Sequence, residues 1–338
     1  MSIRSNILAF LALLGLLLAG CDRRSPIAYG EANSIIVVAD EATWSEVADE
    51  AHATLEPTIF TTRDERTFTL THVSPSHEDW LKLRQFREVL VIGRQTDWWV
   101  EPVLASAGGT PSSLPAIVDA SDVWARGQHV TALVVPEDDV AARVSEALPA
   151  VHDRYESRFQ EYVRTRMYTS GVDTARAARL EREAGFSILL PEVYSEFEPN
   201  DSTYMFRNDN ATSGQLLRSV LVTWRSGARE MTPEEILDWR DAVAAEAYPT
   251  GQTSARERIE TRDPEHQGDR ALEVQGIWQG TDPSFPLAGP FRTRVVSCPE
   301  QDRTYLLDAW LYIPGRSKYE YVLQLQTILD SFVCGTRS

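Results

Sequence analysis

Short hydrophobic runs alternate with amphipathic segments along the first half of this 338-residue chain. Each run has the length of a buried strand. Asp40 follows the first run and can cap a helix, in which apolar residues recur at helical spacing from Trp44 to Leu55. Strands are predicted on this basis at 34–39, 67–73, 89–92 and 130–135. Because strands alternate with helices, residues 34–137 are predicted to form an α/β domain.

A long helical pattern then covers residues 138–184. Apolar residues from Val140 to Met167 keep a helical spacing, but Pro149 lies among them and is expected to kink or split the helix, because proline lacks a backbone N–H. Gly185 stands where a helix commonly ends in a left-handed residue. We interpret 138–184 as a helical connection between two domains.

The second half has strands that follow one another closely. They are predicted at 186–190, 216–224, 270–278, 291–298 and 304–312. Residues 232–235 (Thr-Pro-Glu-Glu) combine a capping box with a proline in the first helical turn, which indicates a helix start. Ser317 can cap a last helix, whose apolar face ends near Phe332. Residues 185–338 are therefore predicted to form an α+β domain, an antiparallel sheet with two helices covering one face.

The predicted fold class for the whole chain is accordingly mixed, α+β with α/β character. Two sandwich-like domains of helices and strands are joined by the long helical segment. A length of 338 residues with 43% hydrophobic residues is sufficient for two packed cores.

The first 20 residues have the pattern of an export signal. Residues 1–6 are polar with one positive charge, and 7–18 form an apolar run. That run is shorter than the roughly 20 apolar residues that span a bilayer. It ends on Leu18-Ala19-Gly20-Cys21, which resembles the lipobox of bacterial lipoproteins. This motif implies a signal peptidase cut before the cysteine and a diacylglycerol on its thiol.

We therefore expect a signal peptide over 1–20, lipidation with a palmitate-type acyl chain at Cys21 and a short tether over 21–33. The alternative is an ordinary secretory signal that is cut elsewhere and leaves Cys21 free. Because two or more acyl chains anchor a protein stably, a lipidated chain would be held on the membrane of the cell envelope, at its periplasmic face. Asp22 follows the cysteine, but whether the inner or the outer membrane carries the anchor stays open.

Charge and cysteine content limit the expected partners and the expected covalent bonds of the chain. The formal net charge is −17, and no basic stripe is present, so nucleic acid is excluded as an expected partner. If lipid occupies Cys21, Cys298 and Cys334 remain as an even pair in an oxidising compartment, where disulfides persist. A disulfide between them would tie the last helix to the sheet; two buried free thiols are the alternative.

Sequence signatures of catalysis are absent. The chain has no glycine-rich phosphate loop, no His-Glu-x-x-His and no Gly-x-Ser-x-Gly, and its six histidines are scattered. The Asn- and Asp-rich segment that ends at Asn210 is interpreted as a polar loop, and it lacks the alternation of a calcium-binding EF-hand. Trp98 and Trp99 are adjacent on a predicted helix, so both cannot be equally buried. No catalytic residue, metal ligand or cofactor is predicted.

Several segments of the chain are similar to an uncharacterised lipoprotein family, found chiefly in Bacteroidetes and their relatives and known only as a domain of unknown function. They are 288–292, 306–315 and the helix at 325–329, together with the opening strand at 34–40 followed by Trp44. The resemblance implies a lipoprotein and provides no catalytic residue. Cys298 and Cys334 depart from it, since they are not associated with this family.

Three functional classes remain after this reading. A non-enzymatic envelope lipoprotein that binds a partner protein or contributes to assembly fits the acidity and the absence of catalytic motifs. A small-ligand or glycan-binding module is the first alternative, since one of the paired tryptophans can face a ligand. An enzyme with an unrecognised site is the second.

Overall fold

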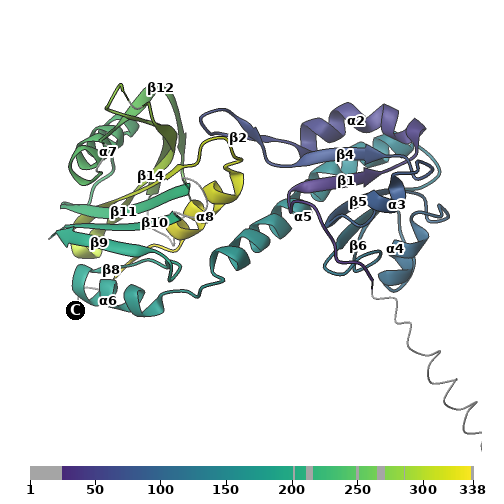
Figure 1. Ribbon diagram of the computed structural model, residues 1–338, viewed down its shortest axis with the longest axis horizontal. Helices are drawn as coiled ribbons and strands as arrows, with labels where there is room; N and C mark the ends of the chain where they lie inside the picture. Colours follow the sequence, from purple (N-terminus) through teal and green to yellow (C-terminus); the bar gives the residue numbers. More distant parts are fainter. Residues whose placement is uncertain are drawn as a thin grey trace, which may run out of the picture. The chain divides into compact units, whose positions relative to one another are not determined.

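The computed structural model in Figure 1 describes residues 25–200, 202–210, 216–248, 251–264, 271–284 and 286–335. Signal-motif residues Leu18, Ala19 and Gly20 lie outside the described residues, as does the predicted lipidation site Cys21. Within the described part of the chain, no helix is long and apolar enough to cross a membrane.

The chain packs as two compact units. The first contains Met1–Glu56 and Phe68–Asp153, and the second contains Pro57–Thr67 and Arg154–Ser338. Residues 57–67, which the sequence pattern placed with the first domain, thus pack with the second unit. The boundary near residue 153 falls inside a single long helix rather than before it.

The first unit is a five-stranded sheet with helices between its strands. Its elements are β1 (Ser34–Val38), α2 (Glu41–Leu55), β4 (Thr69–Val73), α3 (Trp80–Leu83), β5 (Glu88–Gly93), α4 (Glu101–Ser106), β6 (Ala116–Ser121) and β7 (His129–Val134). The strand order is β4-β1-β5-β7-β6. The first four strands in that order run parallel and only β6 runs antiparallel, beside β7. The predicted α/β arrangement is confirmed, with β6 added.

Side chains from both faces of this sheet are buried. Ile36 and Val38 of β1 pack with Trp80 of α3 and Val103 of α4. Ile35, one residue earlier and on the other face, is fully buried as well. A strand covered on both faces needs apolar residues at every position, because neither face meets water. This explains why the sequence showed continuous apolar runs rather than alternation.

The helix that follows, α5 (Val140–Met167), is continuous and has Pro149 inside it. Pro149 therefore does not split the helix, and of the two expected effects only a kink stays a prediction. Buried apolar residues lie on both sides of the proline, among them Val144 and Tyr155. Their burial stabilises the helix enough to tolerate the one backbone hydrogen bond that proline cannot make.

The second unit is built on a seven-stranded antiparallel sheet of order β12-β13-β14-β15-β11-β10-β9. Its further elements are β2 (Thr58–Ile59), β3 (Glu65–Arg66), α6 (Thr174–Ala184), β8 (Phe186–Ser187), β9 (Ser195–Asn200), β10 (Thr203–Asn210), β11 (Leu216–Ser226), α7 (Pro233–Ala247), β12 (Gln252–Arg262), β13 (Ala271–Gly280), β14 (Ala288–Cys298), a 3-10 turn (Pro299–Gln301), β15 (Arg303–Tyr312), α8 (Tyr319–Asp330) and β16 (Val333–Cys334). The predicted hairpin between β14 and β15 is confirmed.

Two helices cover this sheet, but on opposite faces. Leu306 and Trp310 of β15 pack with Trp239 of α7. Leu307, which points the other way, packs with Leu325 of α8. The prediction that both helices cover one face is corrected by this arrangement. In a strand successive side chains point to opposite faces, and nearly every residue of β15 is buried, so each face is covered by its own helix.

The segment predicted as a polar loop before Asn210 forms strands instead. Residues Ser195–Asn200 and Thr203–Asn210 pair as the antiparallel strands β9 and β10, at one edge of the sheet. Phe206 is completely buried, and its neighbour in sequence Arg207 forms an ion pair with Asp209. β9 is the edge strand, and β10 lies between β9 and β11. Arg207 and Asp209 are tolerated in β10 because they alternate with Phe206 and so point to the opposite face of the sheet.

Three predicted signals at helix ends are confirmed, but the expected cap at Ser317 is wrong, because the N-cap of α8 is Lys318 and no side chain caps that helix. Thr232 accepts a hydrogen bond from the backbone of Glu235, whose carboxylate accepts one from the Thr232 N–H at 2.8 Å. Asp40 caps α2 by accepting from the Thr43 N–H at 2.9 Å. Gly185 ends α6 with a φ of 80°, the left-handed conformation that glycine adopts without strain.

Candidate functional site

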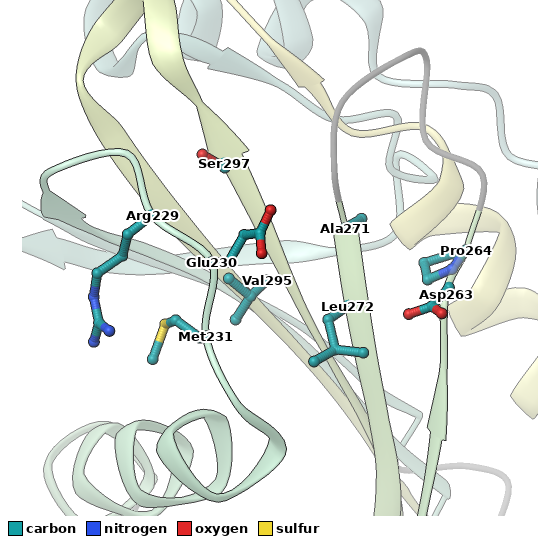
Figure 2. A pocket seen from close by; sticks show the side chains of 9 residues that line it. All are labelled: Arg229, Glu230, Met231, Asp263, Pro264, Ala271, Leu272, Val295 and Ser297. Atoms are coloured by element: carbon teal, nitrogen blue, oxygen red, sulfur yellow. The ribbon is translucent and has the colours of Figure 1, made fainter.

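A cavity of about 450 Å³ opens on the α7 face of the second unit (Figure 2). It lies between the loop before α7 and the ends of strands β12, β13 and β14. Nine described residues line it: Arg229, Glu230, Met231, Asp263, Pro264, Ala271, Leu272, Val295 and Ser297. We name this site the α7 pocket. Its volume falls within the range of about 300–1,000 Å³ that is typical of small-molecule sites.

The loop that forms one wall is fastened to the start of β15. Gly227 donates its backbone N–H to the carbonyl oxygen of Asp302 at 2.8 Å. The Thr304 hydroxyl donates to the carbonyl of Gly227 at 2.6 Å and accepts from the N–H of Arg229 at 3.1 Å. These bonds fix the loop backbone, so the wall of the α7 pocket is preformed.

The floor of the α7 pocket is apolar and its edge is charged. Met231, Leu272 and Val295 belong to the core that packs under α7, and Met231 and Val295 are buried. Glu230 and Asp263 supply carboxylates and Arg229 a guanidinium. An apolar floor with a few charged groups at its rim fits a ligand that has both an apolar and a polar part.

The rim arginine is held by the first turn of α7. Arg229 Nη1 lies 2.9 Å from Glu235 Oε1. This hydrogen bond, together with the one from the Thr232 backbone, lowers the pKa of the Glu235 carboxyl. Glu235 thus fixes the direction of Arg229 at the pocket rim.

The ionisable groups among the nine lining residues are the carboxylates of Glu230 and Asp263 and the guanidinium of Arg229. Ser297 is the one hydroxyl among the nine lining residues, and histidine, lysine and cysteine are absent from them. Across the described part of the chain, no group of three or more His, Cys, Asp or Glu residues is placed to hold a metal ion.

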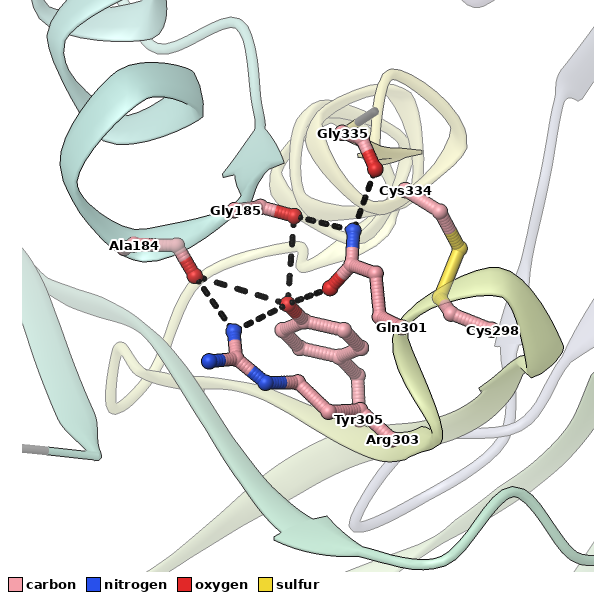
Figure 3. Close-up of a disulfide and its surroundings, with 8 residues drawn as sticks. All are labelled: Ala184, Gly185, Cys298, Gln301, Arg303, Tyr305, Cys334 and Gly335. Atoms are coloured by element: carbon pink, nitrogen blue, oxygen red, sulfur yellow. Dashed lines mark hydrogen bonds between the residues drawn. A yellow bond between two sulfur atoms is a disulfide. The ribbon is translucent and has the colours of Figure 1, made fainter. Parts of the chain in front are cut away.

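Cys298 and Cys334 lie at disulfide distance, with their Cα atoms 6.0 Å apart, and form a disulfide (Figure 3). Cys298 ends β14 and Cys334 lies in β16, which pairs with β8. Gln301 donates to the carbonyl oxygens of Gly185 and Gly335, and the Tyr305 hydroxyl lies 2.6 Å from Gln301 Oε1. The bond and this network join the chain end to the sheet, which is a structural role.

Two further pairs of ionisable residues lie close together in the sequence, and each of these residues has a local partner. Asp238 and Asp241 of α7 both form ion pairs with Arg256. His72 contacts the carbonyl of Ala39 through Nε2 at 3.0 Å, whereas His77 lies at the surface near Asp79. These histidines hold separate segments and do not form one site.

Sequence reasoning missed a buried polar cluster beneath α7. Asp308 of β15 lies 3.0 Å from Arg240 Nε, and both side chains are at most 1% exposed. Its carboxylate also accepts from the Tyr248 hydroxyl at 2.7 Å and from the Thr293 hydroxyl at 2.6 Å. Burial, and then the Asp308 charge, raise the pKa of Tyr248. The available signal was the position of Arg240, directly after Trp239 on an otherwise apolar helix face.

Comparisons with known proteins fit this picture of uncharacterised domains. The family model "Domain of unknown function (DUF8532)" matches residues 28–166, and "Domain of unknown function (DUF4837)" matches residues 173–331. Each of the two models matches less than half of the chain. No curated protein matches the chain. The expectation of an uncharacterised domain family is confirmed to this extent.

Solved structures share only distant similarity with the chain. The Ran-binding protein Mog1p of Saccharomyces cerevisiae has 10% identity and a TM-score of 0.33, over 45% of this chain and 91% of that one. LpqN, involved in cell envelope biogenesis of Mycobacterium tuberculosis, has 9% identity and a TM-score of 0.27, over 43% and 79%. The type VI immunity protein TplEi of Pseudomonas aeruginosa has 16% identity and a TM-score of 0.24, over 48% and 60%. These scores support no functional inference.

Proposed function

We propose that this protein is a lipid-anchored, non-enzymatic binding protein of the cell envelope, and that its second unit binds an amphiphilic ligand in the α7 pocket. The observation that carries the proposal is the preformed cavity of about 450 Å³ with its apolar floor and charged rim. The N-terminal pattern supports the proposed location in the cell envelope, because an apolar run that ends on Leu18-Ala19-Gly20-Cys21 resembles the lipidation signal of bacterial lipoproteins.

The chemistry of the cavity defines the ligand class. Leu272 and Met231 offer an apolar surface, which favours burial of a hydrocarbon group by about 25 cal/mol per Å². Arg229, Glu230 and Asp263 at the rim favour a polar head that can accept and donate hydrogen bonds. A ligand with one apolar end and one polar end satisfies both requirements.

Anchoring depends on one thiol. Replacing Cys21 with alanine removes the only atom that can carry the lipid, so the variant is expected to lose partition into the detergent phase of a Triton X-114 separation. Intact mass spectrometry of the wild-type chain should show the mass of the acylated product that begins at Cys21. An unmodified mature N-terminus in the wild-type chain would contradict the anchor.

Binding in the α7 pocket can be measured with a fluorescent amphiphile, 1-anilinonaphthalene-8-sulfonate, on the full chain in detergent-free buffer after release of the lipid. Leu272→Glu places a charge on the apolar floor of the α7 pocket. The variant is expected to bind the probe with about tenfold lower affinity, which corresponds to about 1.4 kcal/mol of binding free energy. Val193→Glu changes an exposed residue of the same unit that does not line the cavity, and it should leave the affinity unchanged. Equal affinity for both variants would contradict the proposed site.

A further inference from the structure

The sheet of the first unit contains a point at which its connections diverge. Strands β1 and β5 are neighbours in the order β4-β1-β5-β7-β6. The chain leaves β1 through α2 and returns in β4, on one side of β1. It leaves β5 through α4 and returns in β6 and β7, on the other side. In open α/β sheets, ligands bind outside the carboxyl ends of the strands at such a switch point.

The strand register shows which residues meet there. Val38 of β1 pairs with Val91 of β5, so Asp40 follows β1 at the level of Gly93. Gly93 in turn pairs with Val134 of β7. The three loops that begin at Asp40, Arg94 and Val135 therefore leave the sheet side by side.

Two carboxylates at this edge hold the loops in place. Asp40 accepts hydrogen bonds from the Thr43 N–H and hydroxyl at 2.9 and 2.7 Å, and so closes the first turn of α2. Asp97 accepts from the Arg94 N–H at 2.7 Å and shapes the loop after β5. Burial would raise the pKa of Asp40, but the bonds from Thr43 and the nearby charge of Arg94 lower it, so this carboxylate is ionised at neutral pH.

An arginine and a glutamate remain available to a ligand. Arg94 Nε lies 3.8 Å from Glu137 Oε2, which is too long for a hydrogen bond. Nε is buried and has no hydrogen-bond partner among the described residues. The Arg94 side chain as a whole is 38% exposed and that of Glu137 81%, so a ligand can reach both side chains although it cannot reach Nε itself.

The loop after β5, which begins at Arg94, also carries an exposed aromatic ring. Trp98 directly follows Asp97 and is 54% exposed. It packs edge-to-face on Trp99, at 5.8 Å between ring centroids, and Trp99 is fixed because its Nε1 donates to the carbonyl of Ile92 at 3.0 Å. The exposed indole therefore rests on a rigid support.

The mixture of groups selects one ligand class. An anion such as phosphate is disfavoured, because the Asp40 carboxylate occupies the start of α2 and Glu137, Asp138 and Asp139 add negative charge at this edge. A neutral sugar ring has hydroxyls that both donate and accept, which matches the Glu137 carboxylate and the Arg94 guanidinium. Its apolar C–H face can lie on the indole of Trp98.

We propose that the carboxyl edge of β1 and β5 is a second binding site, which takes a neutral saccharide through Trp98, Arg94 and Glu137. This site lies in the first unit and is independent of the α7 pocket, which lies in the second. The two proposals can therefore fail separately.

The test is an array of neutral and sulfated or sialylated oligosaccharides, probed with the full chain in detergent. Neutral glycans should bind, and Trp98→Ala should reduce their binding about tenfold. Trp98→Phe should restore part of it, because a ring is present again. Leu81→Ala removes another exposed apolar residue of the same unit, outside the three loops, and should have no effect.

Three results would overturn this proposal: absence of binding to every neutral glycan, binding confined to anionic glycans, or equal binding by wild-type and Trp98→Ala. Circular dichroism melting curves would show that the Trp98 variants are folded. Leu272→Glu in the α7 pocket should leave glycan binding unchanged, so a loss in that variant would also contradict an independent site.

Discussion

Replacing Asp308 with alanine is expected to lower the free energy of unfolding of the second unit by about 3–5 kcal/mol. The variant removes the buried partner of the Arg240 guanidinium, since Asp308 and Arg240 form an ion pair at 3.0 Å and are almost completely inaccessible. The partly exposed Asp241 stays at 3.5 Å from Arg240 Nη1 and compensates only in part. The hydroxyls of Tyr248 and Thr293 lose the same acceptor. An unpaired buried charge is among the costliest defects that a protein core can contain.

Chemical denaturation followed by the fluorescence of the tryptophans measures this loss, with Asp238→Ala as the matched control. Asp238 is 77% exposed and pairs with a surface arginine, so its removal should cost less than about 1 kcal/mol. The double variant Arg240→Met/Asp308→Leu should recover part of the stability, because no lone charge remains. A loss for Asp308→Ala as small as that of the control would refute the assigned role.

Cys298→Ser is expected to destabilise the second unit by about 2–5 kcal/mol, through loss of the disulfide with Cys334. The two cysteines are 36 residues apart in the sequence, so the disulfide closes a sizeable loop. Without the disulfide this loop gains conformational entropy in the unfolded chain, which favours unfolding. The first segment to loosen should be β16, because only residues 333 and 334 pair it with β8.

Peptide mapping without reductant shows whether the bond forms, and thermal melts of the variants measure its contribution. Cys334→Ser should have the same effect as Cys298→Ser, and the double variant should add little, since both changes break one bond. Two cysteines that alkylate as free thiols under denaturing, non-reducing conditions would rule out the disulfide.

Much of the fold could be predicted wherever local chemistry dominates. The capping box at residues 232–235 and the glycine at 185 act within one helical turn, so the sequence alone places those helix ends. The apolar runs at 34–39 and 89–92 are also local signals, because a strand covered on both faces needs continuous apolar residues.

The two candidate binding sites could not be predicted from such local signals. The α7 pocket collects residues from 229 to 297 that come together only when β12, β13 and β14 pair in register. The edge proposed for a saccharide likewise depends on β1 lying next to β5 in the sheet, although β4 lies between these two strands in the sequence. The sequence contributed one part of it, that Trp98 and Trp99 cannot be equally buried, and Trp98 is the exposed one.

The sequence by itself determined the alternation of strands and helices, the helix ends at Asp40, Gly185 and Thr232, and the pair of cysteines that can bond. The segment that resembles a lipobox is also a local signal, because it is contained in four consecutive residues. Only the tertiary structure decided that α7 and α8 lie on opposite faces of one sheet, that the polar residues before Asn210 form strands, and that Arg240 is buried against Asp308. The physical reason is that burial and strand pairing depend on partners that are far away in the sequence. A charged side chain is expected at the surface unless an opposite charge is known to lie beside it, and only the tertiary structure shows that partner.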